Sequence, residues 1–116
     1  PESIAIPADA KAQDVPALVW QVLRTCYDPE IPVDIVELGL VYGVDVDPME
    51  GGQLRVRVRM TLTAPGCGMG EVLVQDVREK VQAIPTVSKV DVELVFDPPW
   101  SQSMMSEAAR LQTGMM

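Results

Sequence analysis

Residues 54–63 read LRVRVRMTLT, and this stretch decides the fold. Leucine, valine and methionine alternate with arginine and then with threonine, so the two sets of side chains face opposite sides of an extended chain. Only the apolar set needs cover from the rest of the protein. The stretch therefore predicts a half-buried β-strand that exposes a column of arginines.

Two weaker patterns of the same period predict a strand on each side of this one. In the first, Tyr42, Val44 and Val46 alternate with Gly43, Asp45 and Asp47; in the second, Val90, Val92, Leu94 and Phe96 face inward, and Lys89, Asp91 and Glu93 face outward. The acidic side chains of the outer strands could flank the arginine column, because opposite charges on neighbouring strands attract. This favours the arginine-bearing strand as the middle one.

Apolar residues spaced three or four apart predict helices between the strands. Leu18, Val22 and Cys26 indicate a helix that begins after Asp14 and ends near Tyr27, and Leu73, Val77, Val81 and Ile84 indicate a second helix that ends at Pro85. A helix between two strands makes a crossover, which sets those strands parallel. We expect a two-layer α+β domain of order α-β-β-α-β, with a small three-stranded mixed sheet and helices packed on one face. A short helix capped by Ser106 or a tail follows.

The length of 116 residues and the 47% apolar content fit one domain. Residues 1–13 have no apolar period, so we expect a flexible lead-in followed by the domain over residues 14–116. Because the chain starts with Pro1, we expect this lead-in to be the remnant of a longer N-terminal segment.

Charge and composition exclude several functions. Nine basic and seventeen acidic residues give a net charge of −8, which repels phosphate backbones and anionic lipids. No apolar run approaches the roughly 20 residues of a membrane-spanning helix. We expect no nucleic-acid partner, no membrane association and a cytoplasmic location. The absence of histidine excludes the Ser-His and Cys-His pairs on which most hydrolases depend.

The two cysteines receive opposite interpretations. Cys67 lies among three glycines between the clearest strand and the second helix, where exposed amides and the helix dipole would stabilise a thiolate. The same turn could equally hold a buried, inert thiol. Cys26 continues the apolar stripe of the first helix, so we expect it to pack in the core.

Two further groups of polar residues leave alternatives open. The carboxylates of Asp28, Glu30, Asp34 and Glu37 could bind a hard cation or act as acid and base, or they could form a solvated acidic loop. Thr61 and Thr63, on the polar face of the strand, could direct hydroxyls towards Cys67 or be ordinary strand formers. Trp100, which follows two prolines, is a candidate partner contact.

Three motifs in one order along the chain resemble those of a known family. The first joins DPEIP (28–32) with ELGLVY (37–42), the second is MTLTAPGC (60–67), and the third joins FDPPW (96–100) with MSE (105–107). Together they resemble the metal–sulfur cluster assembly family, which includes SufT, PaaD and the MIP-type factors, and they are most similar to SufT. The similarity runs from about Asp14 to Met116.

The resemblance implies a small α/β fold without turnover of its own, which matures iron–sulfur clusters or delivers them to client proteins. It places the signature positions at Asp28, Glu30, Thr61, Thr63 and Cys67. We expect Cys67 to be the metal ligand for a transient cluster or iron, the other four to shape the pocket, and no cofactor to be tightly bound. No residue is assigned a catalytic role.

The chain could act with its partners in two ways, either by sharing the ligands of a cluster with them or by docking them without binding metal. One thiolate cannot fill the four cysteine positions of a usual cluster site, so ligands would be shared across a homodimer or with an assembly protein or client. Alternatively, the chain is a metal-free adapter that docks assembly machinery onto client apoproteins through Trp100 and the acidic loop with Glu37. A thiol redox function would need Cys26 as the resolving cysteine.

Overall fold

The computed structural model describes residues 12–29, 31–63 and 70–114, and its centre is a three-stranded sheet. The strands lie in the order β1 (Val41–Pro48), β2 (Leu54–Met60), β3 (Val87–Leu94). β2 is antiparallel to β1 and parallel to β3. The predicted mixed sheet, with the arginine-bearing strand in the middle, is confirmed.

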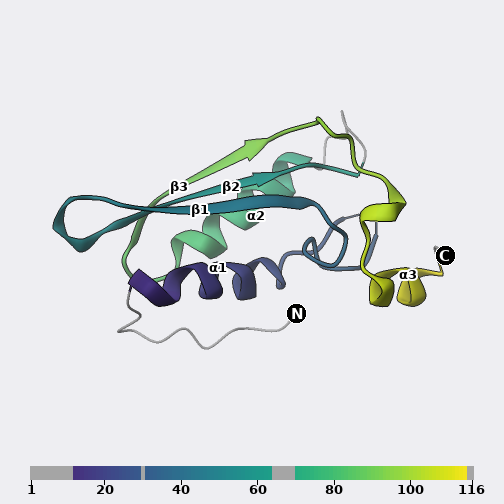
Figure 1. Ribbon diagram of the computed structural model, residues 1–116, viewed down its shortest axis with the longest axis horizontal. Coiled ribbons are helices and arrows are strands. Elements are labelled where there is room, and N and C mark those ends of the chain that lie inside the picture. Colours follow the sequence, from purple (N-terminus) through teal and green to yellow (C-terminus); the bar gives the residue numbers. More distant parts are fainter. Residues whose placement is uncertain (1–11, 30, 64–69, 115–116) are drawn as a thin grey trace.

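The helices lie where a two-layer α+β domain requires them. α1 (Val15–Leu23) and α2 (Gly70–Gln82) cover the same face of the sheet, and α3 (Glu107–Thr113) lies at one end of the molecule (Figure 1). α2 connects β2 to β3, which is the predicted crossover. The predicted fold class is confirmed.

β2 has one apolar and one charged face. Its leucine, valines and methionine are buried against the helices, whereas its arginines lie on the open face. Arg55 Nε is 2.7 Å from Asp91 Oδ2 on β3, and Arg59 Nε is 3.9 Å from Asp45 Oδ2 on β1. Exposed ion pairs contribute at most about 1 kcal/mol each. The charges therefore favour the strand order, and the buried face supplies most of the stability.

α1 begins as predicted but ends four residues before the expected Tyr27. The Thr25 and Cys26 amides bond to carbonyls three residues back, at 2.9 and 3.1 Å, which closes the helix. The Cys26 carbonyl then accepts from the Ile35 amide at 2.9 Å, so the chain turns into a loop instead of a further helical turn. Cys26 is nevertheless buried in the core, as predicted.

The end of β3 is more exposed than its alternation predicts. Val90 is buried, but Leu94 is 38% exposed and Phe96 is 45% exposed, so the inward placement of the last two was wrong. β3 is an edge strand whose pairing with β2 ends at Met60 and Leu94. Phe96 lies beyond the sheet, where alternation no longer decides burial.

The loop between α1 and β1 is fastened to the end of β2 by its backbone. The Ile35 amide bonds to the Cys26 carbonyl, the Leu40 amide to the Ile35 carbonyl at 3.0 Å, and the Thr61 amide to the Leu40 carbonyl at 2.8 Å. These bonds link Cys26, Ile35 and Leu40 to the end of β2, where the motif MTLTAPGC (60–67) begins.

The tail after β3 packs back onto this loop. Trp100 donates its indole N–H to the Leu38 carbonyl at 2.7 Å, and the Tyr42 hydroxyl donates to the Pro98 carbonyl at 2.7 Å. α3 follows, and Ser106 Oγ accepts the Ala109 amide at 3.0 Å as its N-cap, as predicted.

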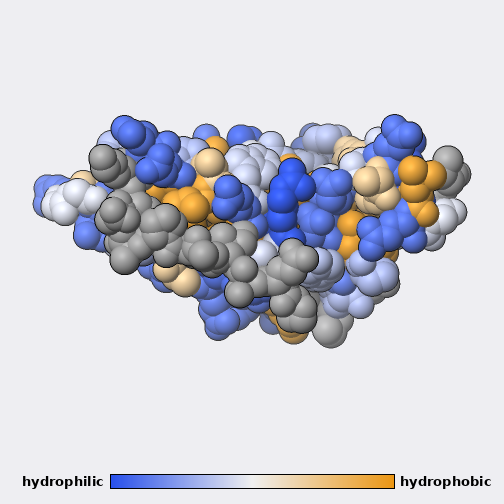
Figure 2. All heavy atoms as spheres, turned by 90° about the horizontal axis from the view of Figure 1, so that it is seen from below, coloured by the Kyte–Doolittle hydropathy of each residue, from blue (hydrophilic) through white to orange (hydrophobic). Residues whose placement is uncertain are grey.

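The molecule measures 46 × 26 × 21 Å, and its β1–β2 hairpin extends beyond the helices (Figure 1). Seen from the side of α1, the surface is mainly hydrophilic, with separate hydrophobic areas towards the two ends of the long axis (Figure 2). Among the described residues, no helix is long and apolar enough to span a membrane. The predicted lead-in falls mainly on residues 1–11, which lie outside the described ranges; residues 12 and 13 belong to a 3₁₀ turn, Ala12–Asp14.

The packing of the tail on the loop can be tested at Gly39. Its φ is +79°, and a Cβ there would overlap the Met104 carbonyl oxygen. Gly51 has a φ of +73°, but a Cβ there would meet no described atom within 4 Å. We expect Gly51→Ala to lower the free energy of unfolding by about 1–2 kcal/mol, and Gly39→Ala to lower it by about 2 kcal/mol more. Urea denaturation followed by tryptophan fluorescence measures both, and equal losses would contradict tight packing of the tail.

Candidate functional site

Three of the five predicted pocket residues lie in the described part of the chain, near one end of the sheet. Asp28 is in the loop after α1, and Thr61 and Thr63 follow the last residue of β2. Cys67 and Glu30 fall outside the described residues, so their predicted roles stay predictions.

Asp28 is a buried carboxylate, only 7% exposed. It accepts the Ile31 amide at 2.8 Å, and Thr63 Oγ1 donates to it in a long hydrogen bond of 3.5 Å. Its own amide bonds to the Val33 carbonyl at 3.3 Å. A carboxylate withdrawn from water needs such donors. The fold thus brings together Asp28 and Thr63, two predicted site residues that are far apart in the sequence.

Thr61 is fully buried, which corrects its predicted place on the exposed polar face. β2 ends at Met60, and the Thr61 amide bonds to the carbonyl of Leu40, the residue before β1, so the alternation along β2 no longer decides which side chain is exposed here. Among the described residues, Thr61 Oγ1 has no hydrogen-bond partner. An unsatisfied buried hydroxyl destabilises the fold. Packing alone therefore does not account for a hydroxyl group at this buried position.

Two carboxylates of the acidic loop, those of Glu37 and Asp34, hydrogen-bond to different partners. Glu37 accepts hydrogen bonds from Ser106 Oγ at 2.8 Å and from Arg24 at 2.9 Å, and these hold the Glu37 pKa below its usual value. Asp34 accepts the Val36 and Glu37 amides, both at 3.1 Å, and burial raises its pKa. In the described ranges, no three acidic or cysteine residues converge as a metal site.

Sequence reasoning missed the partners of the two predicted contact residues. Glu37 is bonded to Arg24 and to Ser106, 69 positions away, while Trp100 is partly buried against the core. The sequence predicted Ser106 only as the N-cap of a short helix, and residue spacing did not indicate Glu37 as its second hydrogen-bond partner. The part of Glu37 and Trp100 in docking another protein stays a prediction.

Comparison with known proteins identifies the family. Residues 16–94 match the family described as "Iron-sulfur cluster assembly protein". The chain belongs to this family. It is 47% identical over 98 residues to the "Fe-S protein maturation auxiliary factor" of Porphyromonas gingivalis, covering 84% of this chain and 90% of that protein.

Two further members support the assignment. The "Fe-S protein maturation auxiliary factor SufT" of Staphylococcus aureus is 44% identical over 87 residues, covering 75% of this chain and 94% of that one. A Bacillus anthracis "Domain of Unknown Function DUF59" has the same fold, with a TM-score of 0.75, 35% identity, and coverage of 90% and 95% of the two chains. The resemblance to SufT and its family is confirmed.

Within this family fold, Cys26 is packed as a core residue. It is buried, and that burial, with Asp76 nearby, raises the pKa of its thiol to about 12. Its Sγ lies 3.8 Å from the Val22 carbonyl oxygen. A thiol that stays protonated is a poor nucleophile, which argues against Cys26 as a resolving cysteine.

The inertness of Cys26 can be measured in a Cys67→Ser variant, which leaves one thiol. We expect native Cys67→Ser protein to be alkylated by iodoacetamide at pH 8 at least about 100-fold more slowly than urea-unfolded protein, because the folded thiol is covered and protonated. Mass spectrometry of timed samples gives both rates. Native alkylation as fast as in the unfolded chain would contradict the burial of Cys26.

The Thr61 hydroxyl can be tested by Thr61→Val, which keeps the shape and removes the unsatisfied atom. We expect the free energy of unfolding to stay equal or to rise by up to about 1 kcal/mol. Thr63→Val is the matched control, and it should lower stability by about 0.5–1 kcal/mol because it loses the bond to Asp28. Thermal and urea denaturation measure both. A loss of stability in Thr61→Val as large as in the control would show that its hydroxyl is satisfied.

Proposed function

We propose that this chain is an accessory, non-catalytic factor that helps to assemble iron–sulfur clusters or deliver them to client proteins. Its cargo, a cluster or iron, is held transiently by the Cys67 thiolate, and Asp28, Glu30, Thr61 and Thr63 line the holding site. The names of its relatives as maturation auxiliary factors support this role.

The observation that carries the proposal is the contact between Asp28 and Thr63. Cys67 follows Thr63 by four residues and precedes Gly70 by three. Covalent geometry limits its Cα to within about 14 Å of the first and about 11 Å of the second. A Cys67 thiolate close to the buried Asp28 is compatible with these limits, which supports the proposal.

The chemistry of the three described residues suits a metal–sulfur cargo. Hydroxyl and carboxylate groups can hydrogen-bond to the sulfur or water ligands of a bound metal and can orient its thiolate ligand. Thr61 Oγ1 has an unused donor among the described residues, so a group bound beside it would satisfy a buried atom. The 13-residue helix α2 begins at Gly70, and the positive end of its dipole favours a thiolate nearby.

The cargo needs ligands from outside one chain. A single thiolate leaves most positions of a cluster open, and Cys26 is buried and protonated. We propose that a second copy or a client supplies the rest, which would make holding weak and transfer easy. The cytoplasmic location stays a prediction.

Anaerobic reconstitution with ferrous iron and sulfide tests the proposal. We expect wild-type protein to acquire iron, acid-labile sulfide and visible absorption, and Cys67→Ser to lose all three. Asp28→Asn keeps the shape but removes a charge beside the cargo, so it should bind iron about tenfold more weakly. Iron and sulfide per chain are determined after gel filtration, which also reports whether loaded protein is dimeric.

Cys26→Ala is the matched control because it also removes one thiol. It should load like wild type, and circular dichroism should show that every variant is folded. Equal iron and equal absorption in wild type and Cys67→Ser would refute the ligand role. Failure of every folded variant to load would favour the metal-free adapter.

A further inference from the structure

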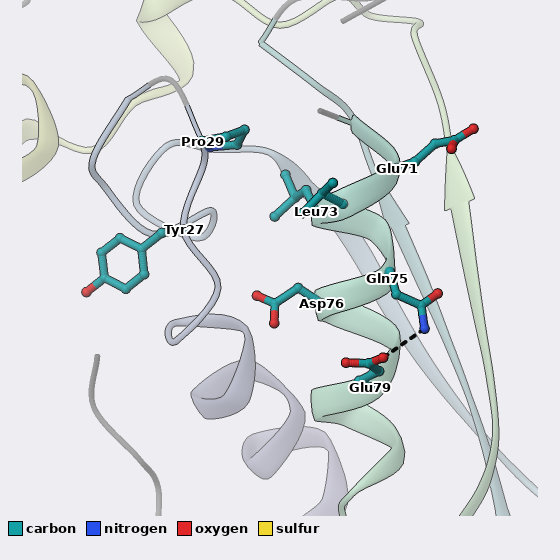
Figure 3. Close-up of a pocket in the computed structure, with 8 residues that line it drawn as sticks. Tyr27, Pro29, Glu71, Leu73, Gln75, Asp76 and Glu79 are labelled. Atoms are coloured by element: carbon teal, nitrogen blue, oxygen red, sulfur yellow. Dashed lines mark hydrogen bonds between the residues drawn. The ribbon is translucent and has the colours of Figure 1, made fainter. Parts of the chain in front are cut away.

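A groove runs between the loop after α1 and the first half of α2. Its volume is about 590 Å³, with Tyr27 and Pro29 on one wall and α2 residues from Glu71 to Glu79 on the other (Figure 3). The groove adjoins the candidate site, since Pro29 follows Asp28 and α2 begins at Gly70. Of its lining residues, Leu73 belongs to the buried core, and none is among the proposed cargo-site residues.

The walls of this groove carry charge of one sign. Glu71, Asp76 and Glu79 line it, and none of its lining residues is basic. Asp76 points from α2 towards the loop, whereas Glu79 lies beside Gln75 on α2 and Glu71 points away from the loop (Figure 3). Lys80 lies 3.2 Å from Asp76 and neutralises that carboxylate in part, so the other two make the net charge negative.

Apolar side chains lie exposed between these carboxylates. Tyr27 is 49% exposed and Val72 is 58% exposed, whereas Leu73, at the upper end of the groove, is buried (Figure 3). Large apolar groups beside a concave surface are typical of a binding surface. The groove thus offers apolar contact bordered by negative charge.

A metal ion does not fit this arrangement. In the described part of the chain, no three acidic or cysteine side chains come close enough together to ligate one, and Glu79 already accepts the Gln75 amide at 3.0 Å. Separated carboxylates around apolar contacts are instead complementary to basic side chains that flank an apolar one.

We infer that the groove docks a short segment of a partner protein in which an apolar side chain lies between lysines or arginines. The apolar side chain packs against Tyr27 and Val72, and the basic ones pair with Glu71 and Glu79. The segment is then held beside the cargo site, which would bring a client close to the Cys67 motif. Docking itself uses no thiol and so is independent of the proposed cargo chemistry.

The test uses ten-residue fluorescent peptides with Phe between two pairs of lysines in a Gly/Ser background. Two matched peptides replace the lysines by glutamates or the Phe by Ser. We expect the Lys–Phe peptide to bind at low salt with a Kd below about 1 mM, and both matched peptides to bind at least about fivefold more weakly. Amide shifts in NMR spectra should map to residues 27–29 and 71–79.

Matched variants separate the groove from the general acidity of the protein. Glu71→Gln/Glu79→Gln should weaken binding at least about fivefold, whereas Glu50→Gln/Glu93→Gln removes the same charge from exposed positions elsewhere and should change it less than about twofold. Val72→Ser should weaken binding, and Leu111→Ser, at an equally exposed position on α3, should not.

Three results would overturn the inference: equal losses in the two charge pairs, no preference for the Lys–Phe peptide, or a Kd above about 1 mM. Cys67→Ser should bind the peptide like wild type. A failed reconstitution therefore leaves the docking result unaffected, and a failed peptide experiment leaves the cargo proposal unaffected.

Discussion

The hydrogen bond from the Thr61 amide to the Leu40 carbonyl holds the two halves of the candidate site together. Both residues are fully buried, so water cannot replace the partners of this 2.8 Å bond. It ties the loop that carries Asp28 to the strand that leads towards Cys67. Since the join is made by backbone atoms, the geometry around Asp28 and Thr63 depends on how the loop is folded more than on any one side chain.

The central part of the fold could be predicted because its signals are local. A period of two in residues 54–63 indicates a strand with one buried face, and the arginines between acidic neighbours favour the observed order. The predictions were wrong where contacts with a segment distant in the sequence determine the end of an element. The Cys26 carbonyl accepts a hydrogen bond from the Ile35 amide, and α1 ends earlier than predicted. The last strand, β3, ends at Leu94, before Phe96. The alternation of residues along one strand does not indicate where the neighbouring elements stop burying its apolar face.

The candidate site was less accessible to sequence reasoning. The motifs named Asp28, Thr61 and Thr63 through a family resemblance, but spacing gave no reason to expect Asp28 beside Thr63. The burial of Thr61 was missed because the strand pattern continues past the last residue of β2. Glu37 and Ser106 show the same difficulty. Sequence reasoning assigned each of them a local role, Glu37 as an acidic loop residue and Ser106 as a helix cap, but their side chains hydrogen-bond to each other across 69 positions. Side chains that meet only after folding leave no periodic signal.

The buried polar residues Asp28 and Thr61, near the end of β2, also bear on function. The core beneath β2 is apolar, yet it continues into a buried carboxylate at Asp28 and a buried hydroxyl at Thr61. Apolar residues of similar shape would avoid the free energy cost of dehydrating these groups. Among the described residues, Asp28 and Thr61 are the polar residues that are buried, and their place at the same end of the sheet is typical of a site whose groups serve binding. The disagreement between the best packing and the observed residues thus marks the same place as the family motifs.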